Sequence, residues 1–343
     1  MTGFEHRKSF LEQVQDLRNS KVILYVTGDR LGLETKIGQD VIDLFIDHLD
    51  AMGPVPKISL VLYTPGGDTA AAWNLVNLVR MFCDEFEVIT PSKCRSSGTL
   101  ICLGSDRIVM TKQATLGPID PTLHHQLGPA YPNGNKDARV AVSVEAVNSY
   151  LDAAKNYGGG DDAATRAFLY LSKKVNPLVL GEIFRSRQQI RDLATRLLAM
   201  QQDINREKVE REKVEKIVDF LCSESGGHDY TINRREALEL GLRVEKCDSD
   251  LYHTVKEISR SYSQELGFRE PLKTNEFLLQ DASNFRADLI GKPINFEYSR
   301  AVIESCYHDA HYFVSRGILE VIKNGDEVSI RENRNFEGWE VRS

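Results

Sequence analysis

The chain has 343 residues, of which 41% are hydrophobic and 27% are charged, and its formal net charge is −7. This composition is typical of a folded globular protein and excludes a largely disordered chain. The negative net charge argues against a protein whose main partner is nucleic acid.

Residues 1–21 are polar and charged and lack the apolar core of a signal peptide. No later apolar run approaches the roughly 20 residues of a membrane-spanning helix, so no transmembrane segment is expected. The cysteines have no paired spacing of the kind that binds metal, so no metal site is expected and they are interpreted as reduced thiols of a cytoplasmic protein. These are Cys83, Cys94, Cys102, Cys222, Cys247 and Cys306.

The first third of the chain alternates apolar strands with amphipathic helices. Strand patterns lie at 22–26, 57–63, 87–90 and 107–111, and helix patterns at 10–17, 37–52, 69–80 and 99–103. Such alternation predicts an α/β fold with a parallel sheet and right-handed crossovers.

Two of these strands are followed by glycine or serine turns that lead into helices. Gly66 and Gly67 follow the second strand within TPGGD, and Ser96 and Ser97 precede the short apolar helix. Glycine lets a ligand approach the main chain closely. A serine at the start of a buried helix lies near free N–H groups that can stabilise an oxyanion. The same serine could instead serve only as a helix cap.

The middle of the chain is mostly helical. Glycine, proline and polar residues predict a loop at 122–137, which contains His124 and His125. A helix is expected at 143–157. A long helical stretch is expected at about 178–221, where Gly and Pro are nearly absent.

The last part of the chain carries no motif that points to chemistry. Its pattern predicts a helix at 302–313 and a β-hairpin at 319–330. We therefore divide the chain into residues 1–266, with the helical insertion inside them, and a C-terminal α+β extension at 267–343.

Three motifs occur in order in the N-terminal part: YTPGGD at 63–68, SSGTLICLGSDRIVM at 96–110 and LGPIDP at 116–121. Together they resemble the serine dehydrogenase proteinases, a branch of the ClpP-like serine peptidases that also include signal-peptide-peptidase A. The resemblance is good over 21–121, and HDYTINRREALELGL at 228–242 resembles the closing part of the same domain. It implies a ClpP/crotonase-like spiral of repeated ββα units and a serine nucleophile.

The resemblance also implies roles for individual residues. Ser96 is the expected nucleophile, because the family places it first in an S-x-G-T turn. The N–H groups of Gly66 and Ser97 are expected to form the oxyanion hole, with Gly67 shaping the turn. Because Ser97 fills the variable position of that turn, a register shifted by one residue stays open.

Related enzymes activate the serine with a lysine or with a His–Asp pair. Segment 108–121 has no histidine where ClpP-type enzymes carry theirs, which favours a Ser–Lys dyad. Lys155 is the expected general base, and its pKa would have to be lowered by burial for it to be neutral. A plain surface lysine is the alternative reading of Lys155. The other candidates for the base are Lys173, Lys174, His124 and His125.

The predicted function is therefore an ATP-independent serine endopeptidase that cleaves peptides or unfolded protein segments without a cofactor. Two alternatives stay open: a crotonase-type acyl-CoA enzyme, which would use acidic residues and not need Ser96, and a non-catalytic assembly or sensor protein. No G-x-G-x-x-G signature supports nicotinamide binding. Proteins of this fold commonly assemble, so a homo-oligomer is expected.

Overall fold

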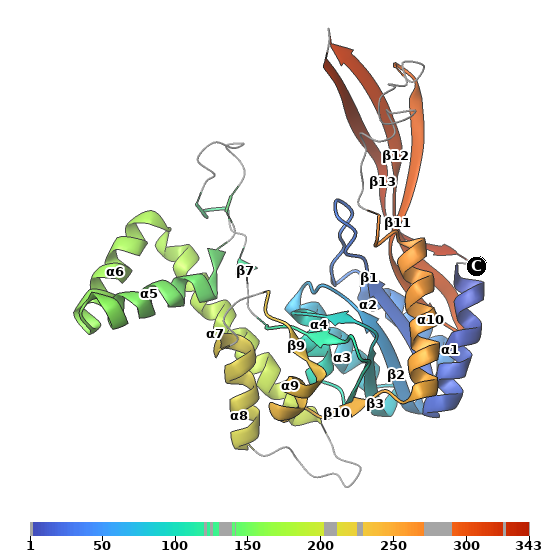
Figure 1. Ribbon diagram of the computed structural model, residues 1–343, viewed down its shortest axis with the longest axis horizontal. Coiled ribbons are helices and arrows are strands. Elements are labelled where there is room, and N and C mark those ends of the chain that lie inside the picture. The colour runs from blue at the N-terminus through green and yellow to red at the C-terminus, as the bar shows by residue number, and fades with distance from the viewer. Residues whose placement is uncertain are drawn as a thin grey trace.

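The computed structural model describes residues 3–119, 122–123, 126–129, 139–140, 142–201, 211–224, 229–270, 290–324 and 327–342. Figure 1 shows a central sheet flanked by helices, with a helical arm to one side. The arm consists of α5 (Val144–Gly158) and α6 (Asp161–Lys174). Three long C-terminal strands project from the opposite part of the sheet. None of the helices in these ranges is both long and apolar enough to cross a membrane.

An eight-stranded sheet forms the centre of the molecule. Its parallel half consists of β1 (Lys21–Thr27), β2 (Val55–Tyr63), β3 (Cys83–Thr90), β5 (Arg107–Met110) and β10 (Val244–Lys246). These strands lie in the order β10-β5-β3-β2-β1, and each is parallel to its neighbour. The predicted parallel sheet is thus confirmed.

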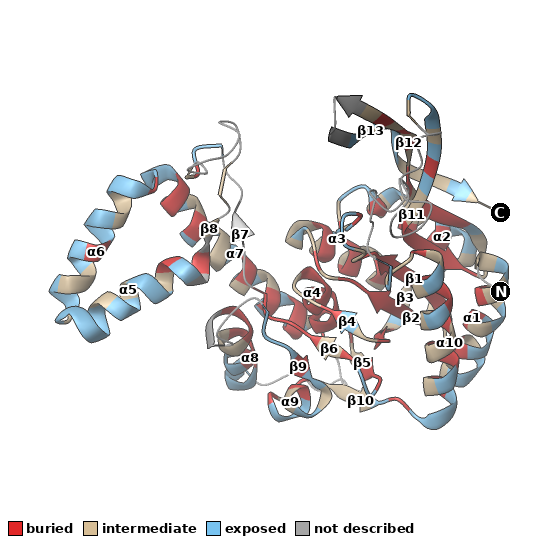
Figure 2. Cartoon of the chain, turned by 45° about the horizontal axis from the view of Figure 1, so that its top comes forward, coloured by how far each residue is buried: buried red, intermediate tan, exposed pale blue. Residues whose placement is uncertain are grey.

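Helices cover both faces of the parallel strands. They are α1 (Phe4–Arg18), α2 (Val41–Met52), α3 (Thr69–Arg80), α4 (Ser97–Leu103) and α10 (Ser249–Glu265). Successive side chains of a strand point to opposite faces. Leu24 of β1 packs in one core with α1 and α10, whereas Tyr25 packs in another with α2 and α3. Because both faces are covered (Figure 2), β1 and the carboxyl-terminal parts of β2 and β3 are buried continuously.

Short strands lie beside the glycine and serine turns that follow β2 and β3. β4 (Lys93–Cys94), β6 (Thr115–Leu116) and β9 (Ile232–Asn233) form a three-stranded sheet, and β7 (Thr122–Leu123) pairs with β8 (Val142–Ser143). Leu116 pairs with Ile232, so the described segment 229–242 returns to the start of the LGPIDP segment. The helix α9 (Arg234–Glu239) follows β9 directly.

The expected helical insertion contains α7 (Pro177–Met200), α8 (Arg211–Asp219) and a π-helical turn at Phe220–Glu224, with 202–210 outside the described residues. Pro177 begins α7, and the side chain of Asn176 accepts a hydrogen bond from the Leu178 N–H at 2.9 Å, which caps the helix. The first half of α7 packs against α5, and its last turns enter the main core beside α4.

The C-terminal strands continue the central sheet. β11 (Pro293–Ser305) pairs antiparallel with β1, and β12 (His308–Asn324) and β13 (Glu327–Arg342) follow. The predicted hairpin is confirmed, since Asn324 pairs with Glu327. The helix expected at 302–313 is wrong: Val302 pairs with Val26 of β1, so long-range strand pairing overrides the local helical pattern.

A buried ion pair fixes these strands to the N-terminal helix. Arg7 of α1 and Glu304 of β11 are both fully buried, and the guanidinium contacts both carboxylate oxygens, with Nε 2.9 Å from Oε2. The hydroxyl of Tyr312 on β12 accepts a further bond from Arg7 at 2.9 Å. Two of the C-terminal strands are therefore anchored to α1 by one guanidinium group.

Candidate active site

Ser96 lies at the sharp turn between β4 and α4. Its backbone has φ 52° and ψ −117°, a combination that L-residues rarely adopt. The other described non-glycine residue with positive φ is Asn19, which has the ordinary left-handed conformation of a helix end. Strain of this kind costs about 1–3 kcal/mol and concentrates at functional sites. It resembles the strand-to-helix turn that exposes the nucleophile of α/β-hydrolases.

The two neighbouring serines differ in accessibility. Ser97 is fully buried, and its Oγ has no hydrogen-bond partner within the described part of the chain. Ser96 is only partly buried. A substrate can reach only an accessible hydroxyl, so the geometry favours Ser96 over Ser97 as the attacking group.

The TPGGD loop lies directly against Ser96. A Cβ atom added to Gly66 would be 2.8 Å from the Cβ and 3.3 Å from the Oγ of Ser96. Gly66 also has φ 122°, a value that side chains disfavour. Glycine is therefore required at this position both for its backbone angle and for the close approach to Ser96.

The other side of the loop is held by Ile37. A Cβ on Gly67 would come within 2.2 Å of the Ile37 carbonyl oxygen. The Ile37 N–H donates to Gly66 O at 2.9 Å, and the Asp68 N–H donates to Ile37 O at 2.8 Å. The Asp68 carboxylate then caps α3 by accepting two backbone N–H bonds. The loop is thus fixed between Ile37 and the turn at Ser96.

Backbone hydrogen bonds join the two motifs. The Thr64 N–H donates to Lys93 O at 3.0 Å, and the Arg95 N–H donates to Thr64 O at 3.1 Å. A Cβ on Gly98 would lie 2.3 Å from Thr64 Cγ2, so α4 sits against the end of β2. The position of Ser96 therefore depends on the strand that carries TPGGD.

The backbone N–H groups expected to form the oxyanion hole differ in whether they already donate a hydrogen bond. The Gly66 N–H donates to Thr64 Oγ1 at 3.0 Å, so it is engaged within the loop. The N–H groups of Gly67 and Ser97 have no acceptor among the described residues. Ser97 is the first residue of α4, where N–H groups have no partner inside the helix. Of the two expected donors, the Ser97 N–H is thus unengaged and the Gly66 N–H is not, and Gly67 offers a further unengaged N–H beside them.

Two residues that the sequence reasoning did not single out support this turn. The Thr99 hydroxyl donates to Gly117 O at 2.8 Å, and the Gly117 N–H donates back to Thr99 Oγ1 at 3.2 Å. A Cβ on Gly117 would be 3.1 Å from the side chain of Arg95, next to Ser96. The signal was present in the threonine of SSGT and the glycine of LGPIDP.

Lys155 does not have the desolvated environment that a neutral lysine requires. Its side chain is 56% exposed, and its Nζ lies 2.9 Å from Oδ1 of Asp161. The hydrogen bond and the charge of Asp161 raise the pKa of Lys155. Both views of the molecule show α5 on the arm, apart from α4 (Figures 1 and 2). The general-base role of Lys155 therefore stays a prediction.

The other candidate bases are no better placed. Lys173 and Lys174 are exposed at the end of α6. His124 and His125 lie outside the described residues.

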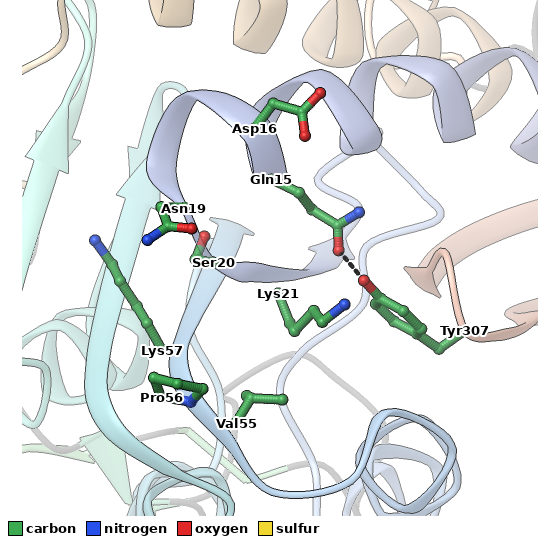
Figure 3. A pocket seen from close by; sticks show the side chains of 9 residues that line it. All are labelled: Gln15, Asp16, Asn19, Ser20, Lys21, Val55, Pro56, Lys57 and Tyr307. Atoms are coloured by element: carbon green, nitrogen blue, oxygen red, sulfur yellow. Dashed lines mark hydrogen bonds between the residues drawn. The ribbon is translucent and has the colours of Figure 1, made fainter.

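A surface hollow lies at the opposite edge of the sheet. It is lined by Lys21 at the start of β1 and by Pro56 and Lys57 near the start of β2, and the hydroxyl of Tyr307 closes one side by donating to Gln15 Oε1 at 2.5 Å (Figure 3). Ligands of open α/β sheets bind at the carboxyl ends of the strands. The hollow is at the amino ends, so it is not part of the site around Ser96.

One protein-family model matches the N-terminal part of the chain. The family model of the ClpP-like SDH-type serine proteinases matches residues 4–133, a range that contains Gly66, Gly67, Ser96 and Ser97 but not Lys155. The resemblance inferred from the motifs is confirmed over this range, and the α/β fold there is of the ClpP type.

Similar chains include two uncharacterized proteins of Methanocaldococcus jannaschii. One is 27% identical over 271 residues, which is 76% of this chain and 81% of the relative. The other is 28% identical over 210 residues, which is 61% of this chain and 58% of the relative. Among solved structures, a variant of the 1510-N membrane-bound stomatin-specific protease has 17% identity and a TM-score of 0.33, covering 66% of this chain and 81% of that one. ClpP1 from Listeria monocytogenes has 12% identity and a TM-score of 0.35, covering 69% and 98%.

The contact between Gly66 and Ser96 predicts a stability effect. Gly66→Ala should lower the free energy of unfolding by about 1–3 kcal/mol, because the new methyl group clashes with Ser96 and the backbone angle is strained. Gly181→Ala, in α7 with open space around it, should raise that free energy by up to about 1 kcal/mol. Urea denaturation of both variants measures the difference. Equal stability of Gly66→Ala and the wild type would contradict the described contact.

Proposed function

We propose that this chain, whose residues 4–133 match the ClpP-like SDH-type serine proteinases, is an ATP-independent serine peptidase that cleaves peptides or unfolded protein segments. The observation that carries the proposal is the backbone of Ser96, held at φ 52° directly against Gly66. We also propose a cytoplasmic location, which the six free cysteines support.

The proposed reaction uses the serine and backbone groups of the site. Ser96 Oγ attacks the carbonyl carbon of the scissile peptide while a base accepts the hydroxyl proton. The N–H groups of Gly67 and Ser97 donate to the oxyanion, and the Gly66 N–H can join them once it releases Thr64 Oγ1. The base returns the proton to the leaving amine, and water then hydrolyses the acyl-enzyme.

The two other functions make different demands on the same site. An acyl-CoA enzyme needs an oxyanion hole but no strained serine at position 96. A non-catalytic assembly protein needs neither. The strain at Ser96 has a use only in the peptidase, which is why we favour it.

Labelling with a fluorophosphonate probe tests the nucleophile. Ser96→Ala should abolish labelling and lower peptide hydrolysis by about 1,000-fold or more, because the attacking oxygen is lost. Ser97→Ala is the matched control: its Oγ is buried and unpaired, so its removal should leave fold and labelling close to those of the wild type.

Two results would change the assignment. If only Ser97→Ala loses labelling, the nucleophile is Ser97 and the assignment within the turn is wrong by one residue. Labelling and hydrolysis that persist in both variants would overturn the peptidase proposal and leave the acyl-CoA and non-catalytic alternatives.

We keep Lys155 as the proposed general base on chemical grounds. A serine hydroxyl needs a base within hydrogen-bond reach, and no histidine occupies segment 108–121. Lys155 would have to leave Asp161 and lose its contact with water, because Asp161 raises its pKa and so keeps it protonated. Association of the arm with another copy of the chain would supply that desolvation.

Substitution of the lysines tests the base. Lys155→Ala and Lys155→Arg should both lower kcat by about 100-fold or more, since arginine stays protonated. Asp161→Asn should raise the rate at neutral pH, because without the carboxylate a larger fraction of Lys155 is neutral. Lys173→Ala and Lys174→Ala test the two alternative lysines on the same arm, and both variants should keep near-normal turnover if Lys155 is the base. Near-normal turnover of Lys155→Ala would exclude it and direct attention to Lys173, Lys174, His124 or His125.

The arm also supports a homo-oligomer. Large apolar side chains on it are exposed, including Tyr157 (91%), Tyr170 (58%) and Leu169 (56%). Soluble monomers rarely present so many apolar groups on one projecting element, and such surfaces are typical of interfaces. We propose that copies of the chain associate through α5 and α6.

Light scattering at micromolar concentration tests this association. The wild type should have a mass that is a multiple of 38.7 kDa. The double variant Leu169→Glu/Tyr170→Glu should shift to smaller species, because it puts charges into the apolar surface. Met81→Glu, at an even more exposed apolar residue outside the arm, should leave the assembly unchanged. A wild-type species of 38.7 kDa alone would contradict the proposal.

A further inference from the structure

Three histidines come together where α2 meets the turn between β11 and β12. His48 lies on α2, and His308 and His311 lie on β12. One ring nitrogen or ligand atom from each lies within 4.8 Å of the others. His48 and His311 are buried, whereas His308 is partly exposed. The cluster contains none of the residues assigned to the Ser96 site.

The hydrogen bonds around the cluster determine which nitrogens are available. His308 Nδ1 lies 2.8 Å from the carbonyl oxygen of Asp309, which can only accept, so Nδ1 carries the proton and Nε2 has the lone pair. His311 Nε2 lies 3.5 Å from Oδ2 of Asp47, which likewise favours a proton on Nε2 and a lone pair on Nδ1. In both rings, one nitrogen thus carries a proton and faces an oxygen, and the other nitrogen has a lone pair.

His48 has the opposite arrangement: because His311 Nδ1 has the lone pair, the proton of His48 lies on Nε2, and Nδ1 accepts from the Ser305 hydroxyl. Its Nδ1 lies 2.8 Å from Ser305 Oγ, and its Nε2 lies 3.1 Å from His311 Nδ1. Tetrahedral zinc with Zn–N bonds of 2.0–2.1 Å separates two ligand nitrogens by roughly 3.3 Å. The observed spacing of His48 Nε2 and His311 Nδ1 is therefore close to that of two ligands of one zinc ion.

The two buried imidazoles, His48 and His311, have lowered pKa values, mainly because burial disfavours the charged form. Burial, together with the neighbouring His311 and His308, lowers the pKa of His48 to about 3. Neutral imidazole is a preferred ligand of zinc, and oxygen acceptors on the outer nitrogens, as here, are the usual support of zinc-bound histidines.

We propose that His48, His308 and His311 bind one zinc ion, with a water molecule as the fourth ligand and Asp47 as the outer partner of His311. Zinc binding replaces the hydrogen bond between His48 and His311. The proton of His48 moves from Nε2 to Nδ1, which then donates to Ser305 Oγ, so no proton is released. The ion joins α2 to the first turn of the C-terminal strands and so has a structural role.

Metal titration of the full chain tests the site. After dialysis against a chelator, the wild type should bind one equivalent of zinc, and cobalt should give a tetrahedral absorption spectrum without a thiolate charge-transfer band. His308→Ala should lose this stoichiometric binding. Because the His308 side chain is partly exposed, the variant should keep its fold, which circular dichroism checks. Asp47→Asn should weaken zinc affinity by about 10–100-fold, because it removes the outer partner of His311.

His253→Ala is the matched control, since His253 is exposed on α10 and outside the cluster. It should bind zinc as the wild type does. The proposal is overturned if the folded wild type binds no zinc, if His308→Ala binds it equally well, or if a thiolate band assigns the metal to the cysteines. In the first case His48 and His311 form only a buried hydrogen bond, with His308 packed beside them.

Discussion

The candidate site depends on one steric constraint: there is no room for a side chain on either glycine of TPGGD. Gly66 lies against Ser96, and Gly67 lies against the backbone of Ile37. The loop therefore acts as a rigid spacer between two segments of backbone that would otherwise be independent. Because Thr64 is bonded to both residues flanking Cys94, a change in this loop is transmitted directly to the turn at Ser96.

The sheet below the site explains why this constraint can be met. Its parallel strands are buried on both faces, so their carboxyl ends are held at a common edge by packing rather than by the loops themselves. Strain of about 1–3 kcal/mol at Ser96 can persist on such a support because the surrounding contacts outweigh it. The strained turn at Ser96 thus depends on the packing of the sheet that supports it.

The sequence was sufficient for the local features. Apolar runs at 57–63 and 107–111 predicted strands, and the glycines and serines predicted the turns between strand and helix. The sequence was insufficient wherever contacts between residues distant in the chain determine the secondary structure or the environment of a side chain. Val302 fits a helical pattern but pairs with Val26, and the environment of Lys155 depends on Asp161 in the next helix. The histidine cluster joins positions 48 and 311, a combination that no spacing rule could suggest.

The pairing of β1 with β11 has a consequence for the synthesis of the protein. Val26 meets Val302, so the ribosome must add 276 residues, which takes roughly 14–55 s at 5–20 residues per second, before this partner exists. Residues 22–27 of β1 are all buried in the finished molecule. Until β11 emerges, the nascent chain carries an apolar strand with one open edge, the kind of surface that recruits unwanted strand partners. Completion of the sheet is thereby tied to completion of translation, and a nascent chain released before residue 293 would keep that edge open.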